Sequence, residues 1–393
     1  FPVYGEDGRL LPYFIAVRNG DEKHLNLVVD GNEHVIRARF ADAEFFYNSD
    51  VKHKLVDFLP RLATLTFQAD LGSMLDKVQR LEKLAPSIAA MVGLTAAETA
   101  VSARAALLSK ADLASELVVE MTSLQGTMGA HYARLSGETD AVAAAIGEQY
   151  RSVSRSKPGL ALALADRLDS LTGLFAAGLA PKGSNDPFAL RRAAIQLIEN
   201  LVVHEISFDL RAATMAAGSL QPVLFDDRVQ ADVLAFVSGR LEGLLRDRNL
   251  PASVVKAVLA AQAHNPYVAL TTAVALQQAI TADDWEPLLD AYARCVRITR
   301  SQTATFALRP ADFALPEEQA LAAAYVAAKA AQDGSVAALV GTLRALQPVI
   351  SQFFDNVLVM DEDTAVRENR LALLQRIAAL ADGIADLSQL EGF

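Results

Sequence analysis

The sequence predicts a mainly α-helical protein with a short β-strand segment at its N-terminus. Ala and Leu, which both favour helices, are abundant, whereas Gly (21) and Pro (14) are sparse for 393 residues. A hydrophobic fraction of 52% beside 21% charged residues is enough for a hydrophobic core, and the length is typical of two or three domains. Apolar residues recur with helical spacing from about residue 38 to the end.

The first 20 residues predict a pair of strands. The apolar runs FPVY and LLPYFIAV flank the turn GEDG, as in a hairpin. The stretch LNLVVDGNEHVI at 25–36 also contains β-branched residues, and we expect it to be extended. Because an isolated hairpin is only marginally stable in water, we expect Phe1 to fall inside a sheet-containing domain whose other strands lie outside this sequence.

Helical patterns then follow one another, separated by Gly, Pro and Asn residues. We expect helices at 72–92, 97–122, 139–150, 159–177, 187–203, 228–247, 252–262, 268–280, 284–302, 317–332, 335–360 and 364–381. The weakest packing is expected at 205–225. No fixed-period repeat is present, which argues against a helical solenoid.

Two runs near the C-terminus predict core-facing helix surfaces. Leu371, Leu374, Ile377 and Leu380 recur every three residues and form the core face of one helix. An apolar stripe before them is also expected to build the bundle, and it consists of Phe353, Phe354, Val357 and Met360.

Net charge, cysteine content and hydropathy exclude several classes of protein. A net charge of −11 argues against a general polyanion binder, although a local basic face is sufficient for phosphate contacts. The single cysteine, Cys295, excludes an intrachain disulfide and a cysteine-rich zinc site, and we expect it in the core of a protein from a reducing compartment. No uncharged apolar run of about 18 residues is present, so we expect no membrane partner.

No complete catalytic motif is present. The six histidines are scattered, and none lies three or four residues from another, as a metal pair on one helix face requires. The sequence also lacks HExxH, a phosphate-binding loop, GxSxG and a dinucleotide-binding glycine pattern. We therefore expect no catalytic residue, no metal and no cofactor in this chain.

Two segments place cations beside features that suit an anion. In 31–50, Arg37 and Arg39 precede an aromatic cluster, which fits either a helix that packs its aromatic face or an edge that contacts phosphate or another subunit. In 179–194, the pair Asp186-Pro187 predicts a capped helix start, and helix N-termini favour anions. The cations of this second segment are Lys182, Arg191 and Arg192. A capped helix with a solvated face is the alternative.

A third segment, 291–302, is the strongest candidate for RNA binding. Arg294, Arg297 and Arg300 recur every third residue and lie along one drifting face of a helix. The alternative is a solvated face paired with Asp290 or Glu286.

Long strings of this sequence resemble a known family. They include FPVYGEDGRLLPYFIAV, GNEHVIRARFADAEFFYNSD, LGSMLDKVQRLEKLA, LAPKGSNDPFALRRAA and FFDNVLVMDEDTAVRENRLALL, in order over nearly the whole chain. The chain resembles the C-terminal portion of the β subunit of bacterial, heterotetrameric glycyl-tRNA synthetase. The resemblance implies the end of a truncated sheet-containing domain at 1–50, an HD-like helical domain at 51–220, connecting helices at 221–284 and a DALR-like anticodon-binding bundle at 285–393.

The resemblance also implies a function. The chain would be the tRNA-binding part of a cytoplasmic aminoacyl-tRNA synthetase, a ligase, and would grip tRNA-Gly at its anticodon and at its acceptor arm or body. ATP and glycine would bind the α part, which would be the second partner and would carry out the chemistry. A separate β subunit and an α–β fusion both fit the sequence.

The resemblance to HD phosphohydrolases implies a degenerate site. An active HD site uses histidines and aspartates to hold a divalent metal that activates water. Here the His-Asp step corresponds to Ala111-Asp112, a ligand histidine to Lys77, and the last aspartate to Asp166. We expect Asp112 and Asp166 to hold buried polar networks instead. A metal-dependent HD-type phosphohydrolase and a purely structural scaffold are the rival functions.

Overall fold

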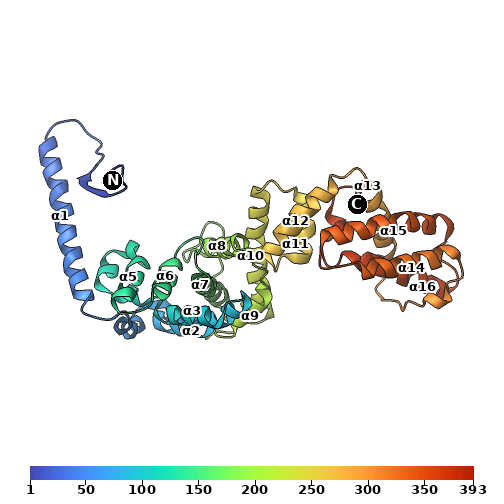
Figure 1. Cartoon of the computed structure of the whole chain (residues 1–393), viewed down its shortest axis with the longest axis horizontal. Helices are drawn as coiled ribbons and strands as arrows, with labels where there is room; N and C mark the ends of the chain where they lie inside the picture. Colours follow the sequence, from blue (N-terminus) through green and yellow to red (C-terminus); the bar gives the residue numbers. More distant parts are fainter.

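The protein is an elongated arrangement of helices with two small antiparallel hairpins. The structure, a computed structural model, describes residues 1–393. In Figure 1 helix α1 stands at one end, a helical domain follows, and a C-terminal helical bundle lies at the other end. The mainly α-helical class predicted from the sequence is confirmed.

The N-terminal hairpin was correctly predicted. Strands β1 (Pro2–Tyr4) and β2 (Leu10–Phe14) pair antiparallel, and Gly8 in the connecting turn has a φ of 74°, which glycine adopts without strain. Every residue of β2 is exposed.

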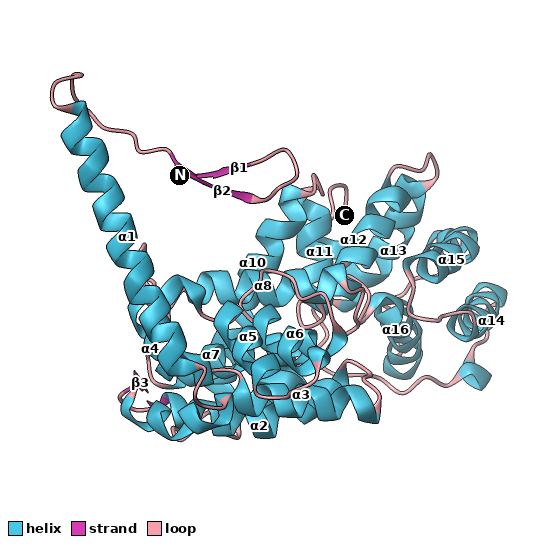
Figure 2. Ribbon diagram, turned by 60° about the vertical axis from the view of Figure 1, so that its left-hand side comes forward, coloured by secondary structure: helices cyan, strands magenta, loops and turns pink.

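The prediction that 25–36 is extended is wrong, because helix α1 spans Leu25–Asp50. The β-branched residues in this stretch lower helix propensity by only a few tenths of a kcal/mol each, so a long helix tolerates them. Along most of its length α1 stands away from the other helices (Figures 1 and 2).

The C-terminal end of α1 is anchored to the helical domain by Asp50, which is 2% exposed. Its carboxylate accepts hydrogen bonds from the amides of Glu116 (2.8 Å) and Leu117 (3.0 Å) and from the hydroxyl of Tyr132 (2.9 Å). These two amides open helix α4 (Glu116–Glu120), where backbone N–H groups lack partners within the helix. Asp50 thus caps a helix 66 residues further along the chain.

The helical domain begins with the 3-10 helix η1 (Leu55–Thr64) and the hairpin of β3 (Thr66–Gln68) and β4 (Gly72–Ser73). Its remaining helices are α2 (Met74–Met91), α3 (Ala96–Leu108), α4, α5 (Thr127–Leu135), α6 (Asp140–Glu148), α7 (Lys157–Ala176), α8 (Leu190–Val203) and α9 (Leu210–Gly218). Helix α7 is the centre, since it packs against α2, α3, α6, α8 and α9 and is buried on nearly every side.

Three local expectations in this domain are corrected. The helix expected at 97–122 ends at Leu108, and α4 restarts after Ser115, whose hydroxyl accepts the amide of Val118. The helix expected from 187 begins at Leu190, because Ala189 takes a left-handed conformation. The segment 205–225, expected to pack weakly, contains α9 with several buried residues.

Three connecting helices lead to the C-terminal bundle. They are α10 (Asp227–Asp247), α11 (Ala252–Gln262) and α12 (Pro266–Ile280). Helix α10 packs against α7, α8 and α9 on one side and α11 on the other. The C-terminal segment returns to α11, where the amide of Asp386 donates to the carbonyl of Ala257 at 2.8 Å. The bundle is therefore fixed to the connecting helices at two places along the sequence.

The C-terminal bundle consists of α13 (Trp285–Thr299), α14 (Pro316–Ala330), α15 (Val336–Asn356) and α16 (Thr364–Ala378). By length and composition alone α15 could cross a membrane, but it packs against α12, α13 and α14, as a core helix does. The prediction that Cys295 is a core residue is confirmed, and burial raises the pKa of its thiol to about 12.

One of the two core-facing runs was predicted correctly. Its members are buried, and they are Leu371, Leu374, Ile377 and Leu380. In the other run, Phe353 and Val357 are buried but Met360 is exposed. The expected helical stripe is wrong here because α15 ends at Asn356, and residues of an extended segment point alternately to opposite sides.

We expect Asp50→Ala to lower the free energy of unfolding of the helical domain by about 2–3 kcal/mol, because three donors, two of them buried, lose their acceptor. Urea unfolding followed by circular dichroism measures this change, and hydrogen exchange at the amides of Glu116 and Leu117 should accelerate. Asp42→Ala, at an exposed position of the same helix, is the matched control. Equal unfolding midpoints for the two variants would show that Asp50 does not anchor α1.

Candidate functional site

A network of buried ion pairs joins α2 to α7. The ammonium group of Lys77 lies 3.0 Å from Oδ1 of Asp166 and 2.8 Å from Oδ2 of Asp169. Arg80, one turn along α2, lies 2.6 Å from Oδ1 of Asp169 and also donates to the carbonyl of Leu71. Cations three residues apart on α2 thus face carboxylates three residues apart on α7, which is the spacing of one helix face.

Lys110 extends this network from the loop after α3. Its ammonium group lies 2.9 Å from Oδ2 of Asp166 and 4.4 Å from the centre of the Tyr150 ring. Burial alone would raise the pKa of Asp166, but the ammonium groups of Lys110 and Lys77 outweigh it and hold that pKa well below its usual value. The carboxylate therefore stays ionised inside the domain.

Asp112 sits beside the network but is bound differently. Its Oδ2 accepts the backbone amides of Gly126 (2.6 Å) and Gly129 (3.1 Å), and the residue is fully buried. Burial raises the pKa of Asp112, although these amides and Lys110 act in the opposite direction. Gly129 must lack a side chain, because a Cβ there would lie 2.9 Å from the Asp112 carboxylate.

The structure brings only part of the predicted degenerate site into contact. Lys77 and Asp166 form an ion pair, whereas the Asp112 carboxylate accepts backbone amides of Gly126 and Gly129 and forms no ion pair with Lys77. Sequence reasoning missed Arg80, Lys110 and Asp169, although the three-residue spacing of the cations and of the carboxylates was visible. That this domain is of the HD type stays a prediction.

The donor set of this network does not fit a divalent metal. No group of three or more His, Cys, Asp or Glu side chains comes together anywhere in residues 1–393. The two carboxylates that could ligate a cation already pair with Lys77, Arg80 and Lys110. These cations repel a metal ion, and the chain supplies no imidazole there. We derive no hydrolytic step from this domain.

Arg294 and Arg297 of α13 and Arg300, the residue that follows this helix, lie in different surroundings. The guanidinium of Arg294 lies 4.4 Å from the centre of the Phe354 ring. Arg297 lies 5.5 Å from the centre of the Phe393 ring and 3.8 Å from Oδ1 of Asp290, which is one of the two acidic partners considered from the sequence. Arg300, at the end of the helix, is exposed and forms no ion pair. Two of the three arginines therefore contact charged or aromatic side chains of the protein, and the third has no such contact.

Of the three cations in and just before α8, one is paired within the protein and two are exposed to solvent. Arg191 donates to the carbonyl of Gly183 and lies 3.7 Å from Oδ2 of Asp186. The same Asp186 carboxylate accepts the amides of Leu190 and Arg191, so it caps α8 from beyond the helix end. Two cations of this segment are exposed and form no ion pair, namely Lys182 and Arg192.

The cations of α1 lie far from both other groups. Arg37 pairs with Glu33 at 2.8 Å, one turn earlier, and Arg39 is exposed without an ion pair. Figure 1 places α1, α8 and α13 at one end, in the middle and at the other end of the molecule. The predicted cationic residues therefore form three separate surfaces rather than one site.

Comparison with known proteins relates these surfaces to a family. Residues 1–260 match the family described as "Glycyl-tRNA synthetase beta subunit", and residues 288–387 match the "DALR anticodon binding domain". The chain belongs to the glycyl-tRNA synthetase β-subunit family. The resemblance stated from the sequence is thereby confirmed, as is the DALR type of the C-terminal bundle.

Curated relatives are β subunits of glycine–tRNA ligase. The chain is 40% identical over its whole length to that of Haemophilus influenzae (strain PittEE) and 39% identical to that of Actinobacillus pleuropneumoniae serotype 7. It is also 40% identical, over 99% of its length, to that of Desulforudis audaxviator. The chain spans 58% of the length of each of these relatives. Arg294, Arg297 and Arg300 all fall inside the region matched by the anticodon-binding domain.

We expect Asp169→Asn in this β-subunit chain to lower the free energy of unfolding by about 3–5 kcal/mol, because Lys77 and Arg80 are left buried without their shared carboxylate. Burial alone would raise the pKa of Asp169, but Lys77 and Arg80 hold it below the usual value. A depressed pKa in the folded state stabilises the protein above the unfolded pKa of about 4, and this stabilisation is lost as the pH falls.

The stability difference between wild type and Asp169→Asn should therefore shrink between about pH 5 and pH 3. Urea unfolding at a series of pH values measures it. Asp140→Asn, whose side chain is 90% exposed, is the control and should change stability by no more than about 0.5 kcal/mol. A difference that stays constant with pH would mean that the ion pairs with Lys77 and Arg80 do not lower the pKa of Asp169 in the folded protein.

Proposed function

We propose that this chain is the tRNA-binding part of a glycine–tRNA ligase. The observation that carries the proposal is the match of residues 288–387 to an anticodon-binding domain, in a chain that belongs to the β-subunit family. The proposed partner is tRNA-Gly, gripped at its anticodon by the C-terminal bundle and at its acceptor arm or body by the helical domain. The ATP-dependent joining of glycine is assigned to the α subunit or α region, the second proposed partner.

The chemistry of α13 supports recognition of an anticodon loop. Single-stranded RNA loops present phosphates for ion pairing and unstacked bases that pack on arginine or aromatic side chains. Arg300 is unpaired and exposed, and the Arg294 guanidinium is held over the Phe354 ring, so both kinds of contact are offered by one helix and its neighbour. The chain as a whole is acidic, so a local cluster of cations is needed to attract RNA.

The arrangement of the molecule supports two separate contacts with one tRNA. The helical domain and the C-terminal bundle lie end to end, joined by α10, α11 and α12 (Figure 1). A long ligand could therefore span both parts. The rival function, metal-dependent phosphohydrolysis, is disfavoured by the buried cations that pair with Asp166 and Asp169.

We expect Arg297→Ala and Arg294→Ala each to weaken binding of a tRNA-Gly transcript while leaving the fold intact. Loss of a phosphate contact lowers the slope of log affinity against log salt by about 0.9 and weakens binding roughly tenfold near 0.1 M salt. Filter binding at several salt concentrations measures both quantities. Loss of a base-stacking contact instead lowers affinity without changing that slope, which separates the two roles.

Arg344→Ala is the matched control, because Arg344 lies in the same bundle but its 2.6 Å ion pair with Asp284 is much closer than the 3.8 Å contact of Arg297 with Asp290. It should bind tRNA-Gly as wild type does. Wild-type affinity in both Arg294→Ala and Arg297→Ala would place the anticodon contact on another face. A wild-type chain without salt-sensitive affinity for tRNA-Gly would overturn the proposed function and leave the scaffold alternative.

A further inference from the structure

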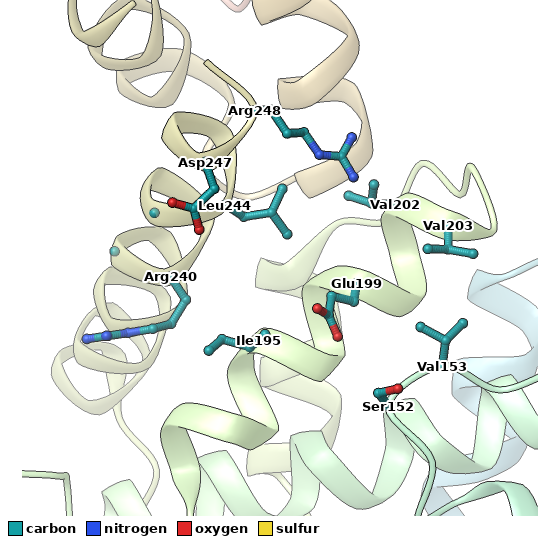
Figure 3. A pocket seen from close by; sticks show the side chains of 12 residues that line it. Ser152, Val153, Ile195, Glu199, Val202, Val203, Arg240, Leu244, Asp247 and Arg248 are labelled. Atoms are coloured by element: carbon teal, nitrogen blue, oxygen red, sulfur yellow. The ribbon is translucent and has the colours of Figure 1, made fainter. Parts of the chain in front are cut away.

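A groove runs between α8 and α10, where the helical domain meets the first connecting helix (Figure 3). Its volume is about 540 Å³, and its third wall is the loop before α7, through Ser152 and Val153. The side chains of Ile195 and Val203, from α8, line it and remain 40% and 57% exposed. Leu244 of α10 faces them across the groove in Figure 3. The structure thus leaves an apolar floor uncovered.

The helix backbone of α10 is itself accessible in this groove. Gly239 and Gly243, one turn apart, both line it, and a Cβ at either position would meet no atom within 4 Å. Glycine inside a helix lowers stability by about 1 kcal/mol relative to alanine. No neighbouring group in this chain would clash with a side chain at either position. The two glycines make room for something that approaches the α10 backbone closely.

Cations without internal partners surround the groove. Arg240 of α10 and Arg248, the residue that follows α10, line it, and neither forms an ion pair. The Arg240 guanidinium lies 5.1 Å from the centre of the Phe236 ring, which holds it at the rim. The loop that contributes Ser152 and Val153 also carries Arg151 and Arg155, which are exposed and unpaired.

Two carboxylates and two arginines line the groove itself, so the excess of positive charge comes from Arg151 and Arg155 on the adjoining loop. Glu199 and Asp247 line the groove. Burial lowers the pKa of Arg167, and the carboxylates of Asp166 and Glu199 oppose that shift, so Glu199 already interacts with a buried cation. In a chain of net charge −11, a groove that together with its adjoining loop has four arginines without ion pairs and two carboxylates is an exception.

We propose that this groove binds the ribose–phosphate backbone of tRNA, as a contact separate from the arginines of α13. The inference rests on the proposed function, which names the RNA but not this site. Phosphates match the unpaired guanidinium groups, riboses match the uncovered apolar floor, and the glycines allow the backbone of the RNA to approach the helix. An apolar groove beside glycines could also hold a helix of another protein, but the excess of cations favours a polyanion.

The central experiment compares Arg240→Ala/Arg248→Ala with wild type in filter binding of a full-length tRNA-Gly transcript. We expect a loss of affinity of roughly fiftyfold near 0.1 M salt, and a salt slope lower by about 1.8, because two phosphate contacts are lost. Arg246→Ala is the matched control, since Arg246 lies on the same helix but pairs with Glu242 at 3.8 Å and does not line the groove. Its affinity should equal that of wild type.

Two further variants separate the groove from a general effect of charge. Glu199→Gln removes a carboxylate from the groove and should strengthen binding of the same transcript. Gly243→Trp fills the groove without changing charge and should weaken binding, whereas Gly243→Ala should not. Circular dichroism melting of each variant checks that its fold is intact.

The outcomes distinguish this inference from the proposed function. If wild type binds tRNA-Gly with salt-sensitive affinity but the double arginine variant, Glu199→Gln and Gly243→Trp all bind as wild type does, the groove assignment is overturned and the function stands. If wild type shows no such affinity, the function itself fails. A Gly243→Trp variant that keeps its tRNA affinity but loses a protein partner in co-purification would assign the groove to a protein helix and overturn the RNA assignment.

Discussion

The ion pairs between α2 and α7 are the constraint on which the helical domain depends. Lys77 and Arg80 on one helix meet Asp166 and Asp169 on the other, away from water. Removing four charges from water is expensive, and the cost is offset only when each charge finds partners in good geometry. Further hydrogen bonds complete the set, including the contact of Gln221 with Asp169 at 3.0 Å. The pairing therefore fixes how α2 and α7 lie against each other.

Helix α7 also contacts most other helices of the domain, so its position determines where they lie. Because it is buried on nearly every side, each polar group on it must find a partner within the protein. Arg167 does so through the carbonyls of Gln149 and Arg151 and the side chain of Gln196, which connects α7 to the loop before it and to α8. The positions of α8 and α10, and hence of the groove between them, follow from packing around α7.

The arginines of this protein fall into two groups, which differ in how far they are buried. Arg80, Arg167 and Arg370 are buried, and each donates to carbonyl groups inside the protein. Arg240, Arg248 and Arg300 are accessible and lack ion-pair partners. The first group holds helices together, whereas the second is available to a polyanion. The network of Lys77, Lys110 and Asp166 belongs to the first group, although its aspartate was considered from the sequence as a remnant of a metal site.

The helical class, the N-terminal hairpin and the core face of α16 could be predicted from the sequence, because local propensity and apolar spacing decide these features. The family followed from the resemblance of long sequence strings. Prediction from the sequence failed at 25–36, where β-branched residues favoured a strand but a long helix formed, and after Asn356, where a helical stripe was expected in an extended segment. Which cations have an ion-pair partner became clear only from the folded structure. Lys77 and Lys110 look like Arg248 and Arg300 in the sequence, yet folding brings carboxylates to the first two alone. That choice depends on contacts between residues far apart in the chain, which spacing along the sequence does not contain.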